Sequence, residues 1–503
     1  MDNLRSPVSR LPPELLVQTF EYLVTRSSPI ILLQICRLWA DIASSIPSLW
    51  TRIDFSTPPA PFLQRCIDRP IEVILSSYPG DPTYKQFAAI RKVLLLCNDR
   101  IHKLALDLPE RRLREIEPEL SGVFPILVDV TIGVRRCNYG SRCREDVPEW
   151  KPAAIALSSI RCLRLLFIKT PWIPGRFRNL VEFFLHEQPC SDFNPTMEAF
   201  LGILDLSPQL IVLSVANAGP RLPIDATTLP PATRVVHLQN LRRLYLEQDD
   251  ACDIGWMLIH LEISASASVR IFVDIRSRGR SAVPPELVFD LALPDHPGFP
   301  HLTKLHRCAY ALAAGPRSII TATNFVLSIT WDHDLRKHFD NFMMPFLRRA
   351  TAAGVIEDLT VFYTERRGYT NTFRWDQIFG SLHCLRKLKF QYPPDDLDLS
   401  VWEFLGSPSG PALRDLWFSY LEFGERGRSS REWAERFVDY CADRDRRGCR
   451  LERLLIETFH PPPDLGPLLG PLLAPYVDHF EIREGSLRCD VSESVFRFPR
   501  ACN

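Results

Sequence analysis

The stretch that decides the N-terminal fold reads SRLPPELLVQTFEYLVTRSSPIILLQICRLWADIASSIPSLWTRIDF and spans residues 9–55. Its prolines predict three short helices. Pro12 and Pro13 can open the first helix, because a proline in the first turn loses no helical hydrogen bond. Ser28, placed just before Pro29, predicts an N-cap for the second helix. A last helical turn is expected to begin at Ser45 or Pro47.

The apolar residues of this stretch are numerous for fewer than fifty residues, which rarely bury a self-sufficient core. Leu15, Leu16, Phe20 and Leu23 recur at helical spacing on the first helix. The second predicted helix runs without a break from about residue 30 to residue 42. Part of this apolar surface is therefore expected to face either another molecule or the rest of the chain, and the residues leave both possibilities open.

The motifs LPPELL, ICRLWADIA and PSLW, in this order and at this spacing, resemble an F-box, and they resemble the F-box-like proteins abundant in mushroom-forming fungi. The resemblance covers about a tenth of the chain. It implies binding to a Skp-type adaptor, which bridges to a cullin–RING ubiquitin ligase. Carried over by position, it implies that the adaptor-facing or bundle-core residues are Leu11, Pro12, Leu15, Leu16, Phe20, Ile35, Cys36, Trp39, Leu49 and Trp50. The sequence does not sort contact residues from core residues.

The composition is that of a folded protein, and its balanced charge favours neither polyanionic nor polycationic partners. The 503 residues include 60 basic and 60 acidic side chains, so no net charge attracts nucleic acid or an anionic membrane. No stretch reaches the roughly 18 apolar residues that a membrane helix needs. The N-terminus lacks a secretory pattern, so the 14 scattered cysteines are interpreted as reduced thiols of an intracellular protein, cytoplasmic or nuclear.

A repeated unit begins near residue 100, with the pattern apolar, two residues, apolar, one residue, apolar. Starts are commonly about 26 to 31 residues apart, which is typical of leucine-rich repeats. The last two apolar residues lie two apart, so both point inward from one short strand. The units are Ile101/Leu104/Leu106, Leu127/Val130/Ile132, Leu163/Leu166/Ile168, Leu180/Phe183/Leu185, Leu210/Leu213/Val215, Leu241/Leu244/Leu246, Ile356/Leu359/Val361, Leu385/Leu388/Phe390, Leu413/Leu416/Phe418, Leu451/Leu454/Ile456 and Val477/Phe480/Ile482.

The predicted fold class is α/β, with a three-helix F-box-like module followed by an irregular solenoid of parallel strands. The asparagine or cysteine that usually follows such strands is mostly missing, and Asn217 lies one position early. The alternative is an α/β domain whose strands share the pattern. The expected organisation is a tail (1–8), the helical module (9–56), a linker with a first strand (57–99) and the repeat domain (100–503).

Motifs for catalysis are absent from the sequence, and no catalytic residue, metal ligand or cofactor is predicted. The best metal-like cluster is Asp332-His333-Asp334 with His338 and Asp340 nearby, and its spacing is typical of a helix start rather than a metal site. Cys137 and Cys143 are five residues apart in an arginine-rich loop, which is poor zinc spacing. Arginines at 276, 278 and 280 indicate an exposed turn or a contact for an acidic or phosphorylated partner.

The expected function is that of a non-enzymatic substrate receptor, in which the F-box-like helices bind the adaptor and the repeats bind a protein client. This expectation takes the adaptor from the resemblance, and the repeat architecture from the sequence itself. Two alternatives stay open. One is an interaction scaffold that uses the helices only internally, and the other is an enzyme whose site is assembled from distant residues. The sequence does not identify the client.

Overall fold

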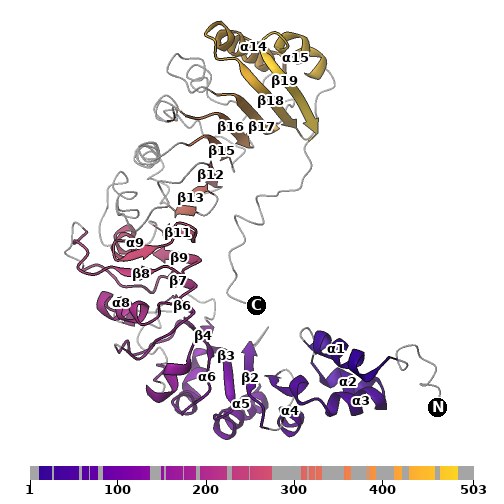
Figure 1. The fold of residues 1–503 in the computed structure, drawn as a ribbon, viewed down its shortest axis with the longest axis vertical. Helices are drawn as coiled ribbons and strands as arrows, with labels where there is room; N and C mark the ends of the chain where they lie inside the picture. Colours follow the sequence, from indigo (N-terminus) through magenta and orange to yellow (C-terminus); the bar gives the residue numbers. More distant parts are fainter. Residues whose placement is uncertain are drawn as a thin grey trace. The chain divides into compact units, whose positions relative to one another are not determined.

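A computed structural model gives the fold of the chain (Figure 1). The structure describes residues 11–24, 28–55, 59–66, 68–76, 83–135, 149–151, 154–173, 175–187, 193–223, 229–248, 250–274, 307–313, 317–322, 325–330, 356–363, 382, 384–391, 413–421, 430–458 and 465–484. These residues fall into two compact units, Met1–Arg221 and Leu222–Asn503. The fold is mixed α/β, with N-terminal helices followed by a solenoid-like region of mostly parallel strands.

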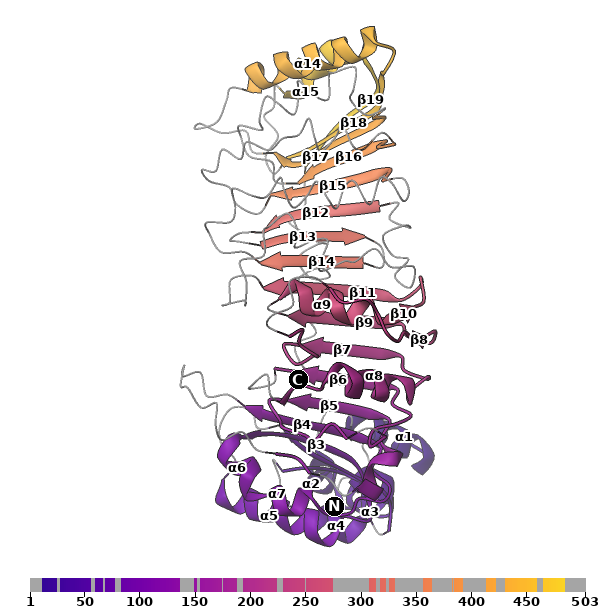
Figure 2. The same ribbon diagram turned by 90° about the vertical axis from the view of Figure 1, so that its left-hand side faces the viewer.

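The first unit places its strands side by side in chain order (Figure 2). Each strand pairs in parallel with the next, from β1 through to β7. The strands are β1 (Arg52–Asp54), β2 (Ile71–Ser76), β3 (Ile101–Pro109), β4 (Asp129–Arg135), β5 (Cys162–Leu166), β6 (Glu182–His186) and β7 (Val212–Ala216). Parallel neighbours need a crossover connection, so every strand is followed by a return segment on one side of the sheet.

The helices of the first unit begin with the N-terminal group, α1 (Pro13–Val24), α2 (Ile30–Ile35), α3 (Arg37–Ser44) and the 3₁₀ helix η3 (Pro47–Trp50). The return segments contain α4 (Ala60–Arg65), α5 (Tyr84–Leu96), α6 (Glu110–Glu115), α7 (Glu117–Leu120), η4 (Ala154–Ser159) and α8 (Met197–Asp205). Thr83 and Gln86 form a capping box that starts α5. Helix α6 packs on β3 and β4, and its Leu113 is buried.

The inward face of these strands is the core. Leu104, Val130, Leu163 and Phe183 occupy one register across β3 to β6, and each is at most 1% exposed. Side chains between them point to the opposite, outward face, because successive residues of a strand alternate. The predicted inward positions are thereby confirmed for β3, β4, β6 and β7.

The predicted unit Leu163/Leu166/Ile168 is framed wrongly. Leu163 pairs with Val130, Leu165 pairs with Ile132, and both are buried, whereas Leu166 lies on the outward face. The unit is therefore Ile160/Leu163/Leu165. Both frames satisfy the pattern because the segment has apolar residues at every candidate position, and only the strand register decides between them.

The second unit is built in the same way but includes one reversal. Strands β9 (Arg243–Gln248), β11 (Ser268–Asp274) and β14 (Phe325–Thr330) pair in parallel. Strand β13 (Arg317–Ala322) is antiparallel to both β14 and β12 (Arg307–Ala313). The parallel order resumes from β12 through β15 (Asp358–Tyr363), β16 (Lys387–Gln391), β17 (Asp415–Leu421), β18 (Leu451–Thr458) and β19 (Val477–Glu484).

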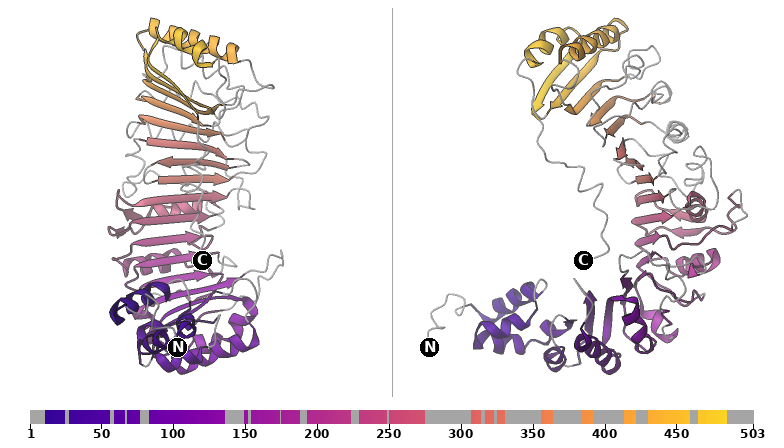
Figure 3. Two further views of the ribbon diagram at one scale, coloured as in Figure 1. Left: turned by 90° about the vertical axis from the view of Figure 1, so that its right-hand side faces the viewer. Right: turned by 180° about the vertical axis from the view of Figure 1, so that it is seen from behind.

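Two further strands, β8 (Val236–Leu238) and β10 (Leu261–Ile263), form a separate parallel pair beside α9 (Ala251–Leu258). The view from behind in Figure 3 shows the last helices, α14 (Ser430–Arg446) and α15 (Leu465–Leu473), against the last strands. Phe437, Tyr440 and Cys441 of α14 are buried. Gly448, at φ 73°, stands two residues after the end of α14, in the left-handed conformation that commonly follows a helix.

Within the described part of the chain, no helix combines the length and the apolar character that crossing a bilayer requires.

Candidate functional site

Helix α1 divides its apolar residues between core and surface. Leu16 and Phe20 are 1% and 0% exposed, whereas Leu11, just before the helix, and Leu15 are 39% and 47% exposed. The helix begins at Pro13, and the amide of Leu15 donates to the carbonyl of Pro12, so the predicted proline start is confirmed. Neighbouring helical residues point about 100° apart. One short helix therefore supports the core and still presents leucine to solvent.

The predicted second helix is two helices. Cys36 has φ −161° and ψ 167°, an extended conformation that ends α2 and begins α3. Helix α2 is rich in isoleucine, whose β-branch lowers helix propensity, so the six-residue helix has little intrinsic drive to continue. The predicted Ser28 cap is also wrong, because α2 has no side-chain cap and the Ser28 hydroxyl finds no hydrogen-bond partner among the described residues.

Aromatic side chains pack the helices of the module against one another and against α4. The Trp39 ring is half-buried, with its centroid 4.8 Å from that of Phe20. The Trp50 indole is fully buried and donates to the carbonyl of Ala43 at 2.8 Å. Phe62 of α4 meets the Trp50 ring edge-on at 5.6 Å. Trp50 therefore joins the helical module to α4 and is not available to a partner.

The ten residues singled out from the sequence thus separate by burial. Those buried in the core are Leu16, Phe20, Leu49 and Trp50. Those of intermediate exposure are Cys36 and Trp39, and those exposed are Leu11, Pro12, Leu15 and Ile35. We assign the buried four a structural role, because a partner cannot contact a side chain without solvent access.

Sequence reasoning missed further apolar side chains on the surface of the module. Tyr22, Ile31 and Leu38 are 60%, 50% and 42% exposed. Leu23, which the sequence places at helical spacing with Leu16 and Phe20, is 38% exposed. Ile31 and Ile35 are four residues apart on α2 and so lie on one face. That spacing was visible in the sequence. It did not reveal a surface, because isoleucines at helical spacing are equally typical of the buried face of a helix.

Residues 8–56 match the family model described as F-box-like. The chain carries an F-box-like domain at its N-terminal end. Such domains serve protein–protein interaction and bind Skp-type adaptors in cullin–RING ligases. A comparison with curated proteins finds no match to the chain.

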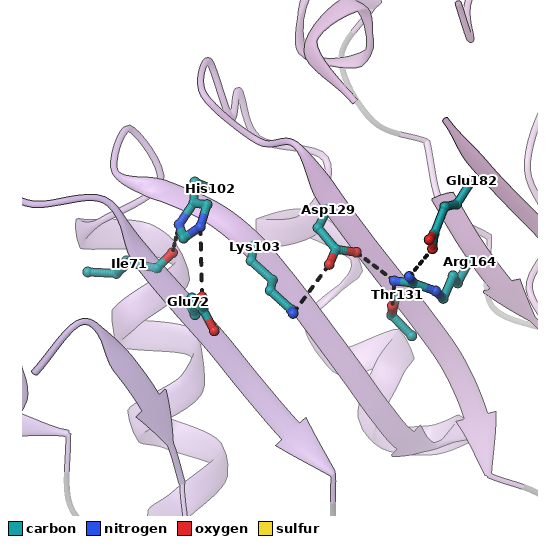
Figure 4. Close-up of polar contacts among 8 residues, drawn as sticks. All are labelled: Ile71, Glu72, His102, Lys103, Asp129, Thr131, Arg164 and Glu182. Atoms are coloured by element: carbon teal, nitrogen blue, oxygen red, sulfur yellow. Dashed lines mark hydrogen bonds and ion pairs between the residues drawn. The ribbon is translucent and has the colours of Figure 1, made fainter. Parts of the chain in front are cut away.

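A second surface, this one polar, lies on the outward face of β2 to β6 (Figure 4). Asp129 accepts from Lys103 at 3.3 Å and from Arg164 at 2.8 Å. Arg164 also pairs with Glu182, and its guanidinium lies 5.1 Å from the centroid of the Phe184 ring. The side chains of four neighbouring strands are thus joined by ion pairs. We call Lys103, Asp129, Arg164 and Glu182 the charged ladder.

The charges of this ladder compensate one another. Burial opposes the charge of Arg164, but Asp129 and Glu182 outweigh it and raise the pKa of the guanidinium. Burial, together with Glu182 and Asp129, raises the pKa of the neighbouring Cys162 thiol to about 11. This thiol is therefore protonated near neutral pH and is a poor nucleophile.

The His102 ring extends the polar row toward β2. Its Nδ1 lies 3.1 Å from the carbonyl oxygen of Ile71, and its Nε2 lies 3.9 Å from the Glu72 carboxylate. A carbonyl oxygen can only accept, so Nδ1 carries the proton in this arrangement. Next to this row, His186 contacts the Ser214 hydroxyl through Nε2 at 2.7 Å, and burial lowers the pKa of the imidazole to about 4.

Other candidates from the sequence lie outside the described residues. These are the cluster around Asp332, the Cys137 and Cys143 pair, and the arginines at 276, 278 and 280. The described residues contain no group of three or more histidine, cysteine or acidic side chains suited to a metal ion.

Proposed function

We propose that this protein is the substrate-receptor subunit of a Skp–cullin–F-box type ubiquitin ligase. The F-box-like helices bind the adaptor, and the outward sheet faces bind a protein client. The observation that carries the proposal is the exposure of Leu11, Leu15, Ile31, Ile35 and Leu38 on a module that matches the F-box-like family. Exposed large apolar side chains gathered on one small module mark an interaction surface.

The mechanism is proximity without chemistry in this chain. The receptor holds its client near a ubiquitin-loaded enzyme and raises the effective concentration of the client's lysines. Binding to the adaptor is driven by burial of apolar surface, at roughly 25 cal/mol for each Å². Such a role implies an intracellular location, in the cytoplasm, the nucleus or both.

A non-ligase scaffold is the second candidate, and a specific observation weighs against it. If the helices served only internal packing, Leu15 and Ile35 would be covered by the first unit, yet they are about half exposed. An enzyme with a dispersed site is the third candidate. Burial raises the pKa of the Cys252 and Cys441 thiols to about 12, which makes them unsuited to nucleophilic catalysis.

The test is co-expression of the full chain with a Skp-type adaptor, followed by pull-down of the adaptor. The variant Leu15→Glu/Ile35→Glu places charges on the exposed apolar surface and leaves the core leucines intact. The matched control is Leu95→Glu on α5, because Leu95 is 60% exposed and lies outside the module. Charging a contact centre should cost on the order of 2 kcal/mol or more of binding free energy.

The proposal predicts that the native chain and Leu95→Glu capture the adaptor and that the double variant does not. Circular dichroism must show the same folded signal for all three chains. If the native chain does not capture the adaptor, the receptor function is rejected and the scaffold function replaces it. If the double variant captures the adaptor as well as the native chain does, the exposed apolar surface is rejected as the adaptor-binding site.

A further inference from the structure

The outward face of β9 and β11 carries two arginines whose charge is not neutralised by any residue that the structure describes. Arg243 and Arg270 lie on adjacent parallel strands, which are side by side in Figure 2. Neither guanidinium makes an ion pair or a hydrogen bond within the described residues. Arg243 is exposed, and Arg270 is partly exposed.

The strand register explains why these two charges stay unpaired. Arg243 stands beside Ser268, and Arg270 stands between Tyr245 on one side and Val326 on the other. None of these register neighbours is acidic. Glu247 lies on the same face, but its carboxylate accepts the Tyr245 hydroxyl. The two guanidiniums therefore have donors that no neighbouring carboxylate takes up.

Aromatic side chains complete this surface. The rings of Tyr245 and Phe272 lie with their centroids 5.1 Å apart, next to Arg270 in the register. Tyrosine, phenylalanine and arginine are the residue types enriched at protein interfaces. We call Arg243, Arg270, Tyr245 and Phe272 the arginine–aromatic face.

The spacing of the two arginines fits an extended acidic peptide. One strand spacing and two residues of rise separate their Cα atoms by roughly 8 Å. Side chains at positions i and i+2 of an extended peptide point the same way and are roughly 7 Å apart. Long arginine side chains can bridge this small difference and bind two such carboxylates.

We propose that the arginine–aromatic face binds an acidic segment of the client, in extended form, with carboxylates at alternate positions. This inference rests on the proposed receptor function, because it names the chemistry of the client. A peptide is favoured over a nucleic acid because the chain has no net charge that would attract a phosphate backbone.

The experiment measures peptide binding to the full chain, without adaptor, by fluorescence anisotropy. The probe is a short fluorescein-labelled peptide with glutamates at alternate positions separated by threonine. Comparison probes replace the glutamates with glutamine or with phosphoserine, and another is a single-stranded oligonucleotide. Because no adaptor is present, failure here is distinct from failure of the adaptor pull-down.

The variant is Arg243→Gln/Arg270→Gln. Its control is Arg178→Gln/Arg386→Gln, which removes the same charge from two exposed arginines that lie off this face. We expect about tenfold weaker binding of the glutamate probe for each arginine lost from the face, because each substitution removes a charge-assisted hydrogen bond to the probe. The control should bind as the native chain does.

Three outcomes overturn the proposal. The native chain does not distinguish glutamate from glutamine, the double variant binds as tightly as the control, or the phosphoserine or oligonucleotide probe is preferred over glutamate. Circular dichroism of both variants keeps a folding defect from being mistaken for lost contact. Preferential binding of the glutamate probe, reduced only in the double variant, supports the proposal.

Discussion

The charged ladder of the first unit and the arginine–aromatic face of the second unit use the same strand geometry in opposite ways. On the ladder, Arg164 is held by two carboxylates and lies over Phe184. On the other face, Arg243 and Arg270 have aromatic neighbours but no carboxylate partner in the part of the chain that the structure describes. The difference predicts that an outward charge with partners inside the chain contributes to stability, and that one without a partner among the described residues contributes little.

The largest effect on stability is expected from pH, through His186 on β6, the last strand of the charged ladder. The folded pKa of His186 is about 4, below the ordinary 6.5, so the unfolded chain binds the proton more readily. The contribution of neutral His186 to the free energy of unfolding is therefore complete above about pH 6.5. It is lost as the pH falls toward 4, and its size is at most about 3 kcal/mol. Urea unfolding of native and His186→Gln chains between pH 7 and 4 measures it. Equal pH slopes for the two chains would contradict the assignment.

The next effect is expected from breaking the ladder itself. Arg164→Met removes the shared cation and leaves Glu182 without the partner it has in the native chain. We expect a loss of about 1–2 kcal/mol, because the pairs are partly exposed and solvent screens them. The urea midpoint should fall, and the difference from native should shrink in high salt. An unchanged midpoint would show that the ladder does not stabilise the unit.

The smallest effect is expected on the arginine–aromatic face. Arg243→Gln and Arg270→Gln should each change the unfolding free energy by less than about 0.5 kcal/mol, because no interaction of either guanidinium is lost. The same urea measurement checks this. A loss as large as that of Arg164→Met would erase the contrast between the two faces and return these arginines to a structural role.

Much of the fold follows from the sequence because the inward strand positions obey one simple rule. In each strand two leucines or similar apolar residues lie two positions apart and point inward. Because side chains alternate along a strand, the residues between them point outward. The rule fails where apolar residues are too many, as in the misframed unit at Leu163. It also cannot anticipate the antiparallel β13, whose direction depends on which strand it meets.

The residues that follow three strands show a further limit of prediction from the sequence. Phe167, Glu187 and Asn217 each stand two residues past the last inward residue of β5, β6 and β7, and their φ angles are 54°, 53° and 50°. Only asparagine is a familiar occupant of this left-handed region. Asn217 donates to the Glu187 carboxylate at 3.1 Å, so neighbouring exits are joined even without a regular asparagine series.

The candidate adaptor surface was predictable only in part. The motif placed Leu11, Pro12, Leu15 and Ile35 among its residues, and these are exposed. It could not separate Leu15 from Leu16, because adjacent helical residues differ only in direction, yet Leu16 is buried and Leu15 is exposed. The break at Cys36 is a backbone event without a proline or glycine to signal it.

The most direct test of the receptor account is hydrogen exchange of the full chain with and without a purified Skp-type adaptor. The account predicts added protection in α1, α2 and α3, and unchanged exchange in β3 to β6. Protection absent from these helices at saturating adaptor, or confined to the sheet, would contradict the central claim that this N-terminal surface is the adaptor-binding site.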